Sequence, residues 1–431
     1  MQKISAMNFI EELRWRGMLN DFTPGVEEFF ATQKIRAYIG FDPTAPSLTI
    51  GNLVQIMILS ILQKHGHTPI VLMGGATGRI GDPSGKDAER QLKTYEELDH
   101  NLAFQTLQMK KFLNFEDGDN KAILVNNLDF YKDMNVLDFL RDVGKNITIN
   151  YMLSKDSVKN RLETGMSYTE FSYQILQAYD FLHLFRNFDC KVQLGGSDQW
   201  GNITAGTEFI RRNVPGAQAF AATTPLLTKS DGKKFGKSEA GNIWMDPEMT
   251  SPYQFYQFWI NSDDADVPKF MKFFSLKSLD EIQSIHDQYA EDMQTYKRIL
   301  AEEMTIRVHS RADFESVLKV SEILFNKNAT AEQLNLLSLS ELNTIAQEIP
   351  AFKVEIDSLN GGLNILDFLS EKTSIVQSKS DARRALNGNA ISLNKIKCTD
   401  AQTEINMGML LKSRFIMVEN GKKNKYLVEF V

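Results

Sequence analysis

Short apolar runs alternate with helical patterns over about the first 220 residues, and this alternation constrains the fold more than any other feature of the chain. The candidate strands are the apolar runs at 35–41, 68–74, 122–126, 191–194 and 223–227. Strands that are joined through helices pair in parallel, because a parallel neighbour can be reached only by a crossover connection. The sequence therefore predicts an α/β domain around a doubly wound parallel sheet, with its ligand at the carboxyl ends of the strands.

The rest of the chain divides into a helical part and a small mixed part. Helix formers dominate from Ser251 to about Ile349, and two short helical patterns and three β-like runs follow a looser stretch. The Asn420-Gly421 dipeptide between the last two runs is typical of a β-hairpin. We expect a Rossmann-like domain at 1–228, a polar loop and all-helical domain at 229–349, a linker at 350–362, and a small α+β domain at 363–431.

Charge is distributed unevenly along the chain. The net charge of the 431 residues is −7, yet residues 363–431 hold 11 basic and 7 acidic side chains, whereas the remainder holds 37 and 48. A basic segment on an acidic body favours contact with a polyanion such as RNA. The side chains of this segment that could meet phosphates are Arg383, Arg384, Lys395, Lys397, Lys412, Arg414, Lys422, Lys423 and Lys425.

The cysteines and the N-terminus indicate where the protein works. Cys190 and Cys398 are too few for a disulfide framework, and neither stands at a metal-ligand spacing, so we expect no metal site and a reducing environment. The first helical pattern, 9–19, carries four charged side chains, which a secretory signal would lack. No apolar run is long enough to cross a bilayer. We therefore expect a cytoplasmic protein.

Glycine-rich turns follow the first two predicted strands. The first turn opens into a helix at Gly51-Asn52, where unpaired backbone N–H groups favour a phosphate and Gly51 permits close approach of a nucleotide. Five glycines in 12 residues follow the second strand, together with Asp82, Lys86 and Arg90. Asp82 could pair with an ammonium group, and the two cations with phosphates.

A predicted helix carries a polar face. Ser167 and Glu170 form a capping-box pattern that begins it. Tyr173, Gln177 and Asp180 then fall on one side, because residues three or four apart in a helix share a face. Donors and acceptors on one face, with apolar neighbours around them, indicate a wall that faces a polar ligand.

Two further segments carry functional residue types. Asp198 follows the glycine pair 195–196 at a predicted strand end, and a carboxylate there suits the hydroxyl groups of a ribose. Lys233, Lys234 and Lys237 surround Gly236 in a polar loop, which makes that loop cationic. Taken singly, each of these segments is also compatible with an ordinary turn or a solvated charged surface.

Together, and in this order, the segments resemble those of bacterial tyrosyl-tRNA synthetases, which are class I aminoacyl-tRNA synthetases, over essentially the whole chain. The most specific strings lie at 40–44, 74–84, 171–173, 195–202 and 234–238. The last, KFGKS, corresponds to the flexible KMSKS loop of the family. The resemblance thus implies that 1–228 is a Rossmann-like catalytic domain and that 229–349 comprises the KFGKS loop and a helical domain on the anticodon side. The C-terminal segment resembles a small RNA-binding domain that the family shares with a ribosomal small-subunit protein.

The resemblance implies that L-tyrosine is activated with ATP to tyrosyl-adenylate and then transferred to tRNA(Tyr). It also implies a homodimer, whose contact we expect around 135–162, and Mg²⁺ that accompanies ATP without an assigned protein ligand. The catalytic residues that it implies are Thr44, Thr49, Asn52, Lys86, Arg90, Lys234 and Lys237. The implied tyrosine contacts are Tyr38, Asp82, Tyr173, Gln177, Asp180 and Gln199, and the implied ATP contacts are Gly40, Asp42, Gly51, Gly196, Asp198 and Lys237.

One signature departs from the family pattern. The family's HIGH motif has a histidine at each end, whereas this chain has Thr49-Ile50-Gly51-Asn52. An alternative is therefore a catalytically impaired RNA-binding paralogue of the same fold. A tryptophanyl-tRNA synthetase is disfavoured by the pair Tyr38 and Asp180, and a nicotinamide dehydrogenase by the lack of a G-x-G-x-x-G fingerprint.

Overall fold

The computed structural model describes residues 7–84, 91–155, 158–159, 165–238, 241–421 and 424–431. The chain forms two compact units, and each is described by itself. Unit 1 comprises Met1–Thr250 and Gln257–Val308, and unit 2 comprises Ser251–Tyr256 and His309–Val431. The helices that the sequence placed together at 229–349 are thus shared between the two units.

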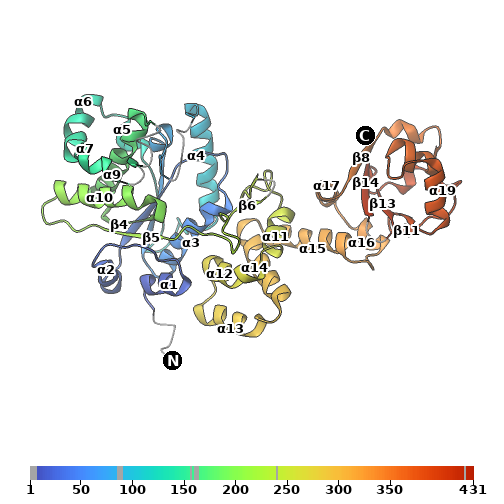
Figure 1. Ribbon diagram of the computed structural model, residues 1–431, viewed down its shortest axis with the longest axis horizontal. Helices are drawn as coiled ribbons and strands as arrows, with labels where there is room; N and C mark the ends of the chain where they lie inside the picture. The colour runs from blue at the N-terminus through green and yellow to red at the C-terminus, as the bar shows by residue number, and fades with distance from the viewer. Residues whose placement is uncertain (1–6, 85–90, 156–157, 160–164, 239–240, 422–423) are drawn as a thin grey trace. The chain divides into compact units, whose positions relative to one another are not determined.

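Unit 1 is built on a five-stranded sheet in the order β3-β2-β1-β4-β5, and all pairs are parallel. From β1 the chain adds β2 and β3 on one side of the sheet, and it then adds β4 and β5 on the other side. A crevice for ligands forms where the order reverses in this way, here between β1 and β4. The predicted doubly wound sheet is therefore confirmed (Figure 1). The strand bounds are β1 (Arg36–Phe41), β2 (Thr68–Met73), β3 (Ile123–Asn126), β4 (Cys190–Gly196) and β5 (Phe220–Thr224).

The last strand lies earlier than the sequence predicted. We expected a strand at 223–227, whereas β5 ends at Thr224, directly before Pro225. Proline has no backbone N–H to donate to a neighbouring strand, so it ends the pairing. The apolar residues after it lie in the connection that leads to the KFGKS loop.

Long helices cover the sheet of unit 1, with α9 and α10 on the side opposite α3 and α4 (Figure 1). Helix α3 is buried along most of its length, and α9 begins at the predicted N-cap, Ser167. The long helices are α3 (Ile50–Lys64), α4 (Tyr95–Met109), α9 (Tyr168–Phe188) and α10 (Trp200–Asn213). Shorter ones are α1 (Phe9–Arg16), α2 (Val26–Thr32), α5 (Leu128–Tyr131), α6 (Val136–Asp138) and α7 (Ile149–Leu153).

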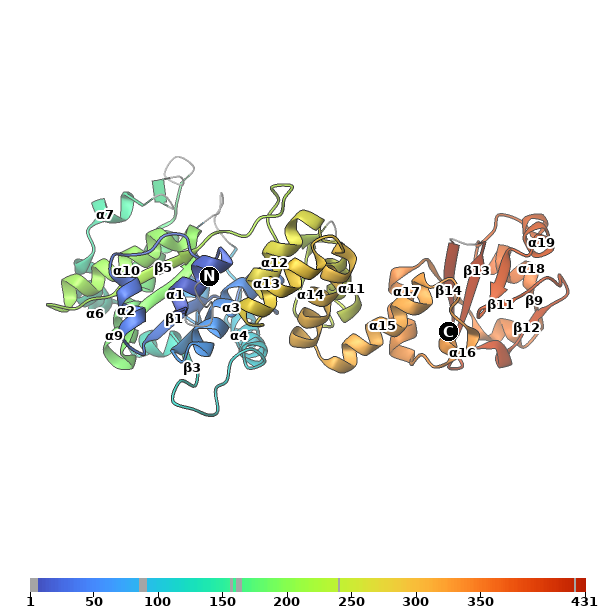
Figure 2. The same ribbon diagram turned by 90° about the horizontal axis from the view of Figure 1, so that it is seen from below.

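A short hairpin and several helices complete unit 1 (Figure 2). The hairpin pairs β6 (Lys237–Ser238) with β7 (Gly241–Asn242). Helix α11 (Pro252–Ile260) begins in unit 2 and ends in unit 1, and α12 (Val267–Phe274), α13 (Leu279–Tyr289) and α14 (Met293–Val308) follow. None of the helices in the described ranges is both long and apolar enough to span a membrane.

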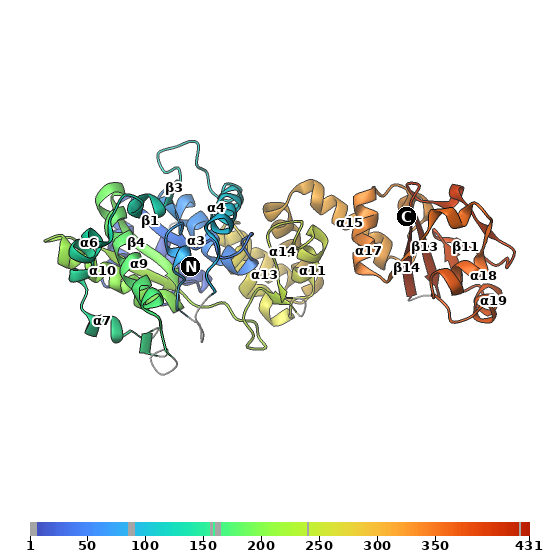
Figure 3. The same cartoon turned by 90° about the horizontal axis from the view of Figure 1, so that it is seen from above.

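Unit 2 combines helices with a mixed sheet in the order β11-β10-β13-β14-β8 (Figure 3). The predicted hairpin joins β13 and β14, and Gly421 has φ +75° in its turn. Strand β8 lies inside the expected linker 350–362 and pairs in parallel with β14. The elements are α15 (Arg311–Phe325), α16 (Ala331–Asn335), α17 (Leu339–Glu348), β8 (Ala351–Val354), α19 (Lys379–Asn387), β10 (Ile391–Leu393), β11 (Ile396–Lys397), β13 (Phe415–Asn420) and β14 (Asn424–Phe430).

Two lysines that were expected to meet phosphates are used inside unit 2 instead. Lys395 Nζ lies 3.3 Å from the Ile323 carbonyl and 2.8 Å from Glu419, and Lys425 Nζ lies 2.9 Å from the same carbonyl. Cations at the last turn of a helix satisfy its unpaired carbonyl groups, so both lysines cap α15. The expectation that these two meet phosphates is therefore wrong.

Candidate functional site

A cavity of about 480 Å³ opens at the carboxyl ends of β1 and β4 in unit 1. It lies where the order of the strands reverses, the usual place for a ligand in a doubly wound sheet. Most of the site residues that the sequence predicted line this cavity. They are Tyr38, Gly40, Asp42, Thr44, Thr49, Gly51, Asn52, Asp82, Tyr173, Gln177, Asp180, Gly196, Asp198 and Gln199.

A chain of hydrogen bonds joins three strand ends to helix α9. Asn127, just after β3, donates from Nδ2 to Asp180 Oδ2 at 2.9 Å and to Thr77 Oγ1 at 3.0 Å. Thr77, after β2, donates to Asp42 Oδ1 at 2.6 Å, and Asp42 Oδ2 accepts from the Tyr173 hydroxyl at 2.9 Å. Because Tyr173 and Asp180 both belong to α9, the chain closes into a ring, which we call the α9 ring.

Asp180 is a buried carboxylate whose pKa lies above its ordinary value. Burial raises the pKa of Asp180 to about 7, although hydrogen bonds from Asn127 and Tyr131 act in the opposite direction. The Tyr131 hydroxyl donates to Asp180 Oδ1 at 2.7 Å. A carboxylate out of water is costly unless such donors compensate it, so Asp180 can change its charge near neutral pH.

Several buried polar atoms in the cavity wall have no hydrogen-bond partner among the described residues. The hydroxyl of Tyr38 is buried and has no hydrogen-bond partner among the described residues, and the same holds for Oε1 of Gln177 and of Gln193. Burial and the charge of Asp180 raise the pKa of Tyr38 well above its ordinary value, so the hydroxyl stays a donor. Buried polar groups without partners indicate a site for a polar ligand.

Asp82, also in the cavity wall, is fixed by amide groups. Its Oδ2 accepts from Gln199 Nε2 at 2.7 Å, and its Oδ1 accepts from the Ser84 backbone N–H at 2.9 Å. Asn202 on α10 donates to Asp82 Oδ1 at 3.4 Å. The structure therefore brings Asp82 and Gln199, which are far apart in the chain, into direct contact.

Two glycines make room for carboxylates. A Cβ on Gly74 would lie 2.0 Å from Asp42 Oδ1, and a Cβ on Gly196 would lie 2.6 Å from Asp198 Oδ1. Both distances are below van der Waals contact, so a larger residue at either position would displace the acid. The two glycines therefore leave the space that the side chains of Asp42 and Asp198 occupy.

The Thr49–Asn52 segment caps helix α3. The backbone N–H and the hydroxyl of Thr49 each lie 2.9 Å from Asn52 Oδ1, and the Asn52 backbone N–H lies 3.4 Å from Thr49 Oγ1. This reciprocal arrangement is a capping box. Since Oδ1 of Asn52 is engaged by Thr49, only the amide nitrogen of Asn52 remains to donate to a ligand in the cavity.

The predicted cations are distributed differently from the other site residues. Lys234 and Lys237 are exposed on the KFGKS loop, and the structure does not place them in the cavity wall. Lys86 and Arg90 lie outside the described residues. Within the described ranges, no group of three or more histidine, cysteine or acidic side chains could hold a metal ion.

Sequence reasoning missed three members of this site: Thr77, Asn127 and Tyr131. Thr77 lies in the glycine-rich turn, and Asn127 follows β3 directly. The rule that ligands gather at the carboxyl ends of parallel strands was sufficient to suggest both. Tyr131 had no such signal, because its contact with Asp180 depends on how α5 packs against α9.

Two family models match the chain, one after the other. A family model described as tRNA synthetases class I (W and Y) matches residues 31–326. A second, described as the tyrosine--tRNA ligase SYY-like C-terminal domain, matches residues 341–428. The first covers more than half of the chain and contains the whole cavity wall.

Curated relatives match over almost the full length. The tyrosine--tRNA ligase of Cytophaga hutchinsonii is 50% identical over 427 residues, which is 98% of this chain and 99% of that protein. The tyrosine--tRNA ligase of Porphyromonas gingivalis strain W83 is 50% identical over 429 residues with the same coverage. Among solved structures, a C-terminally truncated Aspergillus nidulans mitochondrial tyrosyl-tRNA synthetase has 31% identity and a TM-score of 0.67, covering 74% of this chain and 94% of that one.

We predict that Thr49→Val destabilises unit 1 and that Thr49→Ser does not. Valine has the shape of threonine but cannot accept the Asn52 N–H, and loss of an N-cap costs about 1 kcal/mol. Urea unfolding of the two variants and the parent measures the difference. Equal stability of Thr49→Val and the parent would contradict the capping role.

Proposed function

The chain belongs to the tyrosine–tRNA ligase family of class I aminoacyl-tRNA synthetases, and from this premise we propose how its cavity carries out the reaction. The protein is a ligase that activates L-tyrosine with ATP and transfers the tyrosine to tRNA. The observation that carries the proposal is the buried pair in the cavity: the Tyr38 hydroxyl, which has no partner in the part of the chain that the structure describes, and the Asp180 carboxylate.

The side chain of tyrosine lies against α9 in this proposal. Asp180 accepts a hydrogen bond from the substrate phenol and Tyr38 donates one to its oxygen. Asp82, Tyr173 and Gln177 hold the substrate ammonium, and Gln199 lies near the carboxylate. Support comes from the cavity, which all six residues line, and from Oε1 of Gln177, for which the described ranges provide no hydrogen-bond partner.

ATP occupies the glycine-bearing side of the cavity in this proposal. Gly40, Asp42, Gly51, Gly196 and Asp198 contact the nucleotide, and Asp198 accepts from ribose hydroxyls. The positive end of the α3 dipole, at Gly51 in the cavity wall, favours the phosphates, as helix N-termini do in many nucleotide sites. Lys237 adds positive charge from the adjoining loop.

The chemistry needs placement and charge stabilisation rather than a general base. The tyrosine carboxylate is already ionised at neutral pH, so it can attack the α-phosphate in line and expel pyrophosphate. The charge that develops on the phosphate oxygens is stabilised by hydroxyl, amide and cationic groups. For this role we propose Thr44, Thr49, Asn52, Lys86, Arg90, Lys234 and Lys237.

Mg²⁺ is proposed to enter with the phosphates of ATP. Its usual ligands at such sites are substrate phosphates, water and one or two carboxylates, so a dedicated protein cage is not needed. We assign no protein ligand to it. We further propose that the protein works in the cytoplasm.

A homodimer is proposed to form through the segment around residues 135–162. Apolar side chains in this segment are exposed: Val136 is 72% exposed, Leu137 76% and Ile149 66%. Exposed apolar patches of this kind mark interaction sites on soluble proteins. Residues 156–157 and 160–162 lie outside the described ranges. Sedimentation equilibrium distinguishes a dimer from a monomer.

We predict that Tyr38→Phe and Asp180→Ala both reduce discrimination against phenylalanine. A site built for the phenol hydroxyl rejects phenylalanine because its own buried groups are left unpaired, and tyrosyl-tRNA synthetases are themselves the standard example of this. Tyr38→Phe removes one such hydrogen bond. The value of kcat/KM for tyrosine divided by that for phenylalanine should therefore fall about tenfold. Unchanged ratios in both variants would contradict the assignment of this pair.

We predict that tyrosine affinity rises as the pH rises through about 7, the pKa of Asp180. The protonated carboxyl group, which prevails below this pKa, is a weaker acceptor for the phenol. Tyr131→Phe removes a hydrogen bond that favours the charged form, so its midpoint moves to higher pH. Equilibrium dialysis with tyrosine from pH 6 to pH 8 measures both midpoints.

The matched control is Tyr179→Phe. Tyr179 stands beside Asp180 on α9 and its ring lies 5.6 Å from that of Tyr131, but the hydroxyl that donates to Asp180 is that of Tyr131. Its loss should leave the midpoint where it is in the parent. Affinity that does not change with pH in this range would contradict the role of Asp180.

The tRNA contact is proposed to lie on unit 2. Arg383, Lys397 and Lys412 are exposed there and can meet phosphates. Lys422 and Lys423 lie outside the described residues. Arg384 pairs with Asp381, and Arg414 pairs with Glu429.

We predict that a chain ending at Ile349 still forms tyrosyl-adenylate but charges tRNA poorly. This cut removes the entire mixed sheet of unit 2, from β8 to β14, and leaves the cavity of unit 1 complete. Adenylate formation and tRNA charging are measured on the same preparation. Charging at the parent rate would contradict the role of the C-terminal residues.

A further inference from the structure

The KFGKS loop contains a buried dipeptide between two exposed lysines. Phe235 is only 7% exposed and Gly236 is buried, whereas Lys234 and Lys237 on either side are exposed. A loop that only had to carry positive charge would not need a buried aromatic residue at its centre. The dipeptide therefore holds this loop at a defined place in unit 1.

Phe235 inserts its ring among four other aromatic rings, which we call the aromatic socket. The ring centroids lie 4.9–5.9 Å from that of Phe235, and the contact with Phe274 is stacked. Such distances are those of favourable aromatic pairs. The socket consists of Phe258 and Trp259 at the end of α11, and Phe270 and Phe274 on α12.

Gly236 lies directly against the first turn of α3. Its φ is +86°, and a Cβ would lie 2.9 Å from Ile50 Cγ2 and 3.2 Å from the backbone nitrogen of Gly51. A residue with a side chain would be strained in this backbone conformation and would push the loop away from α3. The loop thus approaches the helix N-terminus that lines the cavity.

Backbone hydrogen bonds continue the contact beyond Gly236. The Ile243 N–H donates to the Gly236 carbonyl at 3.1 Å, and the Ile50 N–H donates to the Ile243 carbonyl at 2.9 Å. The Met245 N–H donates to the Leu48 carbonyl at 2.9 Å. The loop, the strand-like segment after it and the start of α3 form one hydrogen-bonded unit.

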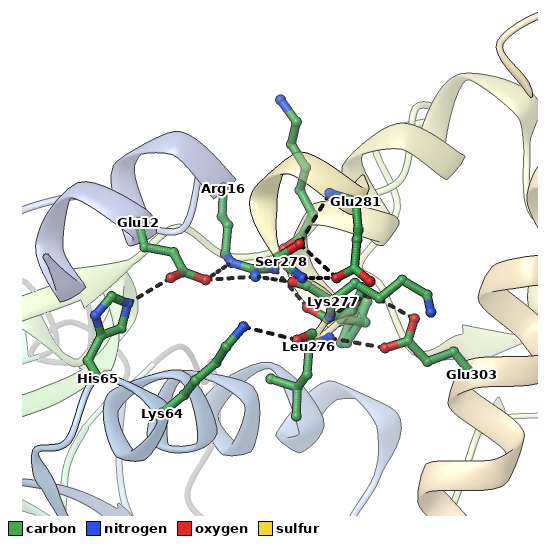
Figure 4. A network of polar contacts seen from close by, with 12 residues as sticks. Glu12, Arg16, Lys64, His65, Leu276, Lys277, Ser278, Glu281 and Glu303 are labelled. Atoms are coloured by element: carbon green, nitrogen blue, oxygen red, sulfur yellow. Dashed lines mark hydrogen bonds and ion pairs between the residues drawn. The ribbon is translucent and has the colours of Figure 1, made fainter. Parts of the chain in front are cut away.

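Helix α12, which carries half of the socket, is itself held by α1 (Figure 4). The side chain of Arg16 is completely buried, and its Nη1 donates to the carbonyl groups of Lys272 at 2.6 Å and Ser275 at 2.8 Å. Glu12 pairs with Arg16 at 2.7 Å and with His65 at 2.7 Å. The end of α12, with Phe274, is therefore fixed relative to α1 and α3.

We propose that Phe235 is a positioning residue for adenylate formation, acting through the aromatic socket to hold Lys234 and Lys237 over the first turn of α3. Lysine side chains are long and mobile, and a charge stabilises a transition state well only when it is placed in advance. Anchoring the residue between the two lysines limits where both can lie. This inference rests on the proposed function of the KFGKS lysines.

The test is tyrosine-dependent exchange of pyrophosphate into ATP by full-length Phe235→Leu, with rates divided by titrated active sites. We expect kcat to fall about tenfold or more and KM for ATP to rise, because small misplacements of catalytic groups have effects of this size. KM for tyrosine should stay within about twofold of the parent, since Phe235 is absent from the tyrosine side of the cavity. Phe235→Met, which fills the socket with a flexible side chain, should recover much of the loss.

Phe273→Leu is the matched control. Phe273 is as buried as its neighbours on α12, but a Cβ on Gly17 would lie 3.9 Å from its ring, so it faces α1 rather than the loop. Both variants remove one buried phenylalanine and should lower Tm. Only Phe235→Leu should change kcat and KM for ATP.

Gly236→Ala leaves every residue of the aromatic socket unchanged. It provides a second way to displace the KFGKS loop from α3. We expect it to lower kcat and raise KM for ATP in the same way, which covers the case in which Phe235→Leu does not fold. Parent values of both parameters in Phe235→Leu or in Gly236→Ala, or an equal loss in Phe273→Leu, would overturn the inference. If the parent chain itself shows no exchange with tyrosine, the proposed function fails first, and the two failures are thereby distinguished.

Discussion

Asp180 holds its carboxyl group inside the protein, and the hydrogen bonds that favour its charged form organise the cavity around it. A buried carboxylate without partners costs several kcal/mol, and each charge-assisted hydrogen bond returns roughly 1.5–3 kcal/mol. Asn127 and Tyr131 provide two such bonds. Through Asn127 the carboxylate is tied to Thr77 and then to Asp42, so the ends of three parallel strands are held in register with α9.

This arrangement gives the cavity its selectivity and its rigidity together. The α9 ring uses both oxygens of Asp42 and fixes the hydroxyl of Tyr173, while Tyr38 stays without a partner among the described residues. Groups that are already oriented need not reorganise when the substrate binds, so more of the binding energy is available for selection. Elsewhere in the cavity wall, Gln199 holds Asp82 in the same manner.

Much of the fold and part of the site could be predicted from the sequence, because both depend on local patterns. Alternating apolar runs and helices indicated the parallel sheet, and the spacing of Tyr173, Gln177 and Asp180 indicated one face of α9. Strand β5 was misplaced because the pattern was extended past Pro225, whose missing N–H ends the pairing. The strand β8 was missed because its pairing partner, β14, lies more than 70 residues later in the chain.

Contacts between distant elements could not be predicted in this way. The rule of strand ends could have pointed to Asn127 and Thr77, but the bond from Tyr131 to Asp180 depends on the packing of α5 on α9. Charge counting could not separate Lys395 and Lys425, which cap α15, from the exposed Lys397 and Lys412. The packing of Phe235 among aromatic residues of α11 and α12 was hidden for the same reason, since the sequence shows only a phenylalanine among lysines.

The central claim is that this cavity activates tyrosine and no other amino acid of similar shape. Exchange of labelled pyrophosphate into ATP by the unmodified full-length chain, run in parallel with tyrosine, phenylalanine and tryptophan, tests it most directly. The account predicts exchange with tyrosine alone, which would also show that Thr49 and Asn52 are sufficient in place of the two histidines. Exchange with tryptophan or phenylalanine at a comparable rate, or no exchange with any of the three, would contradict it.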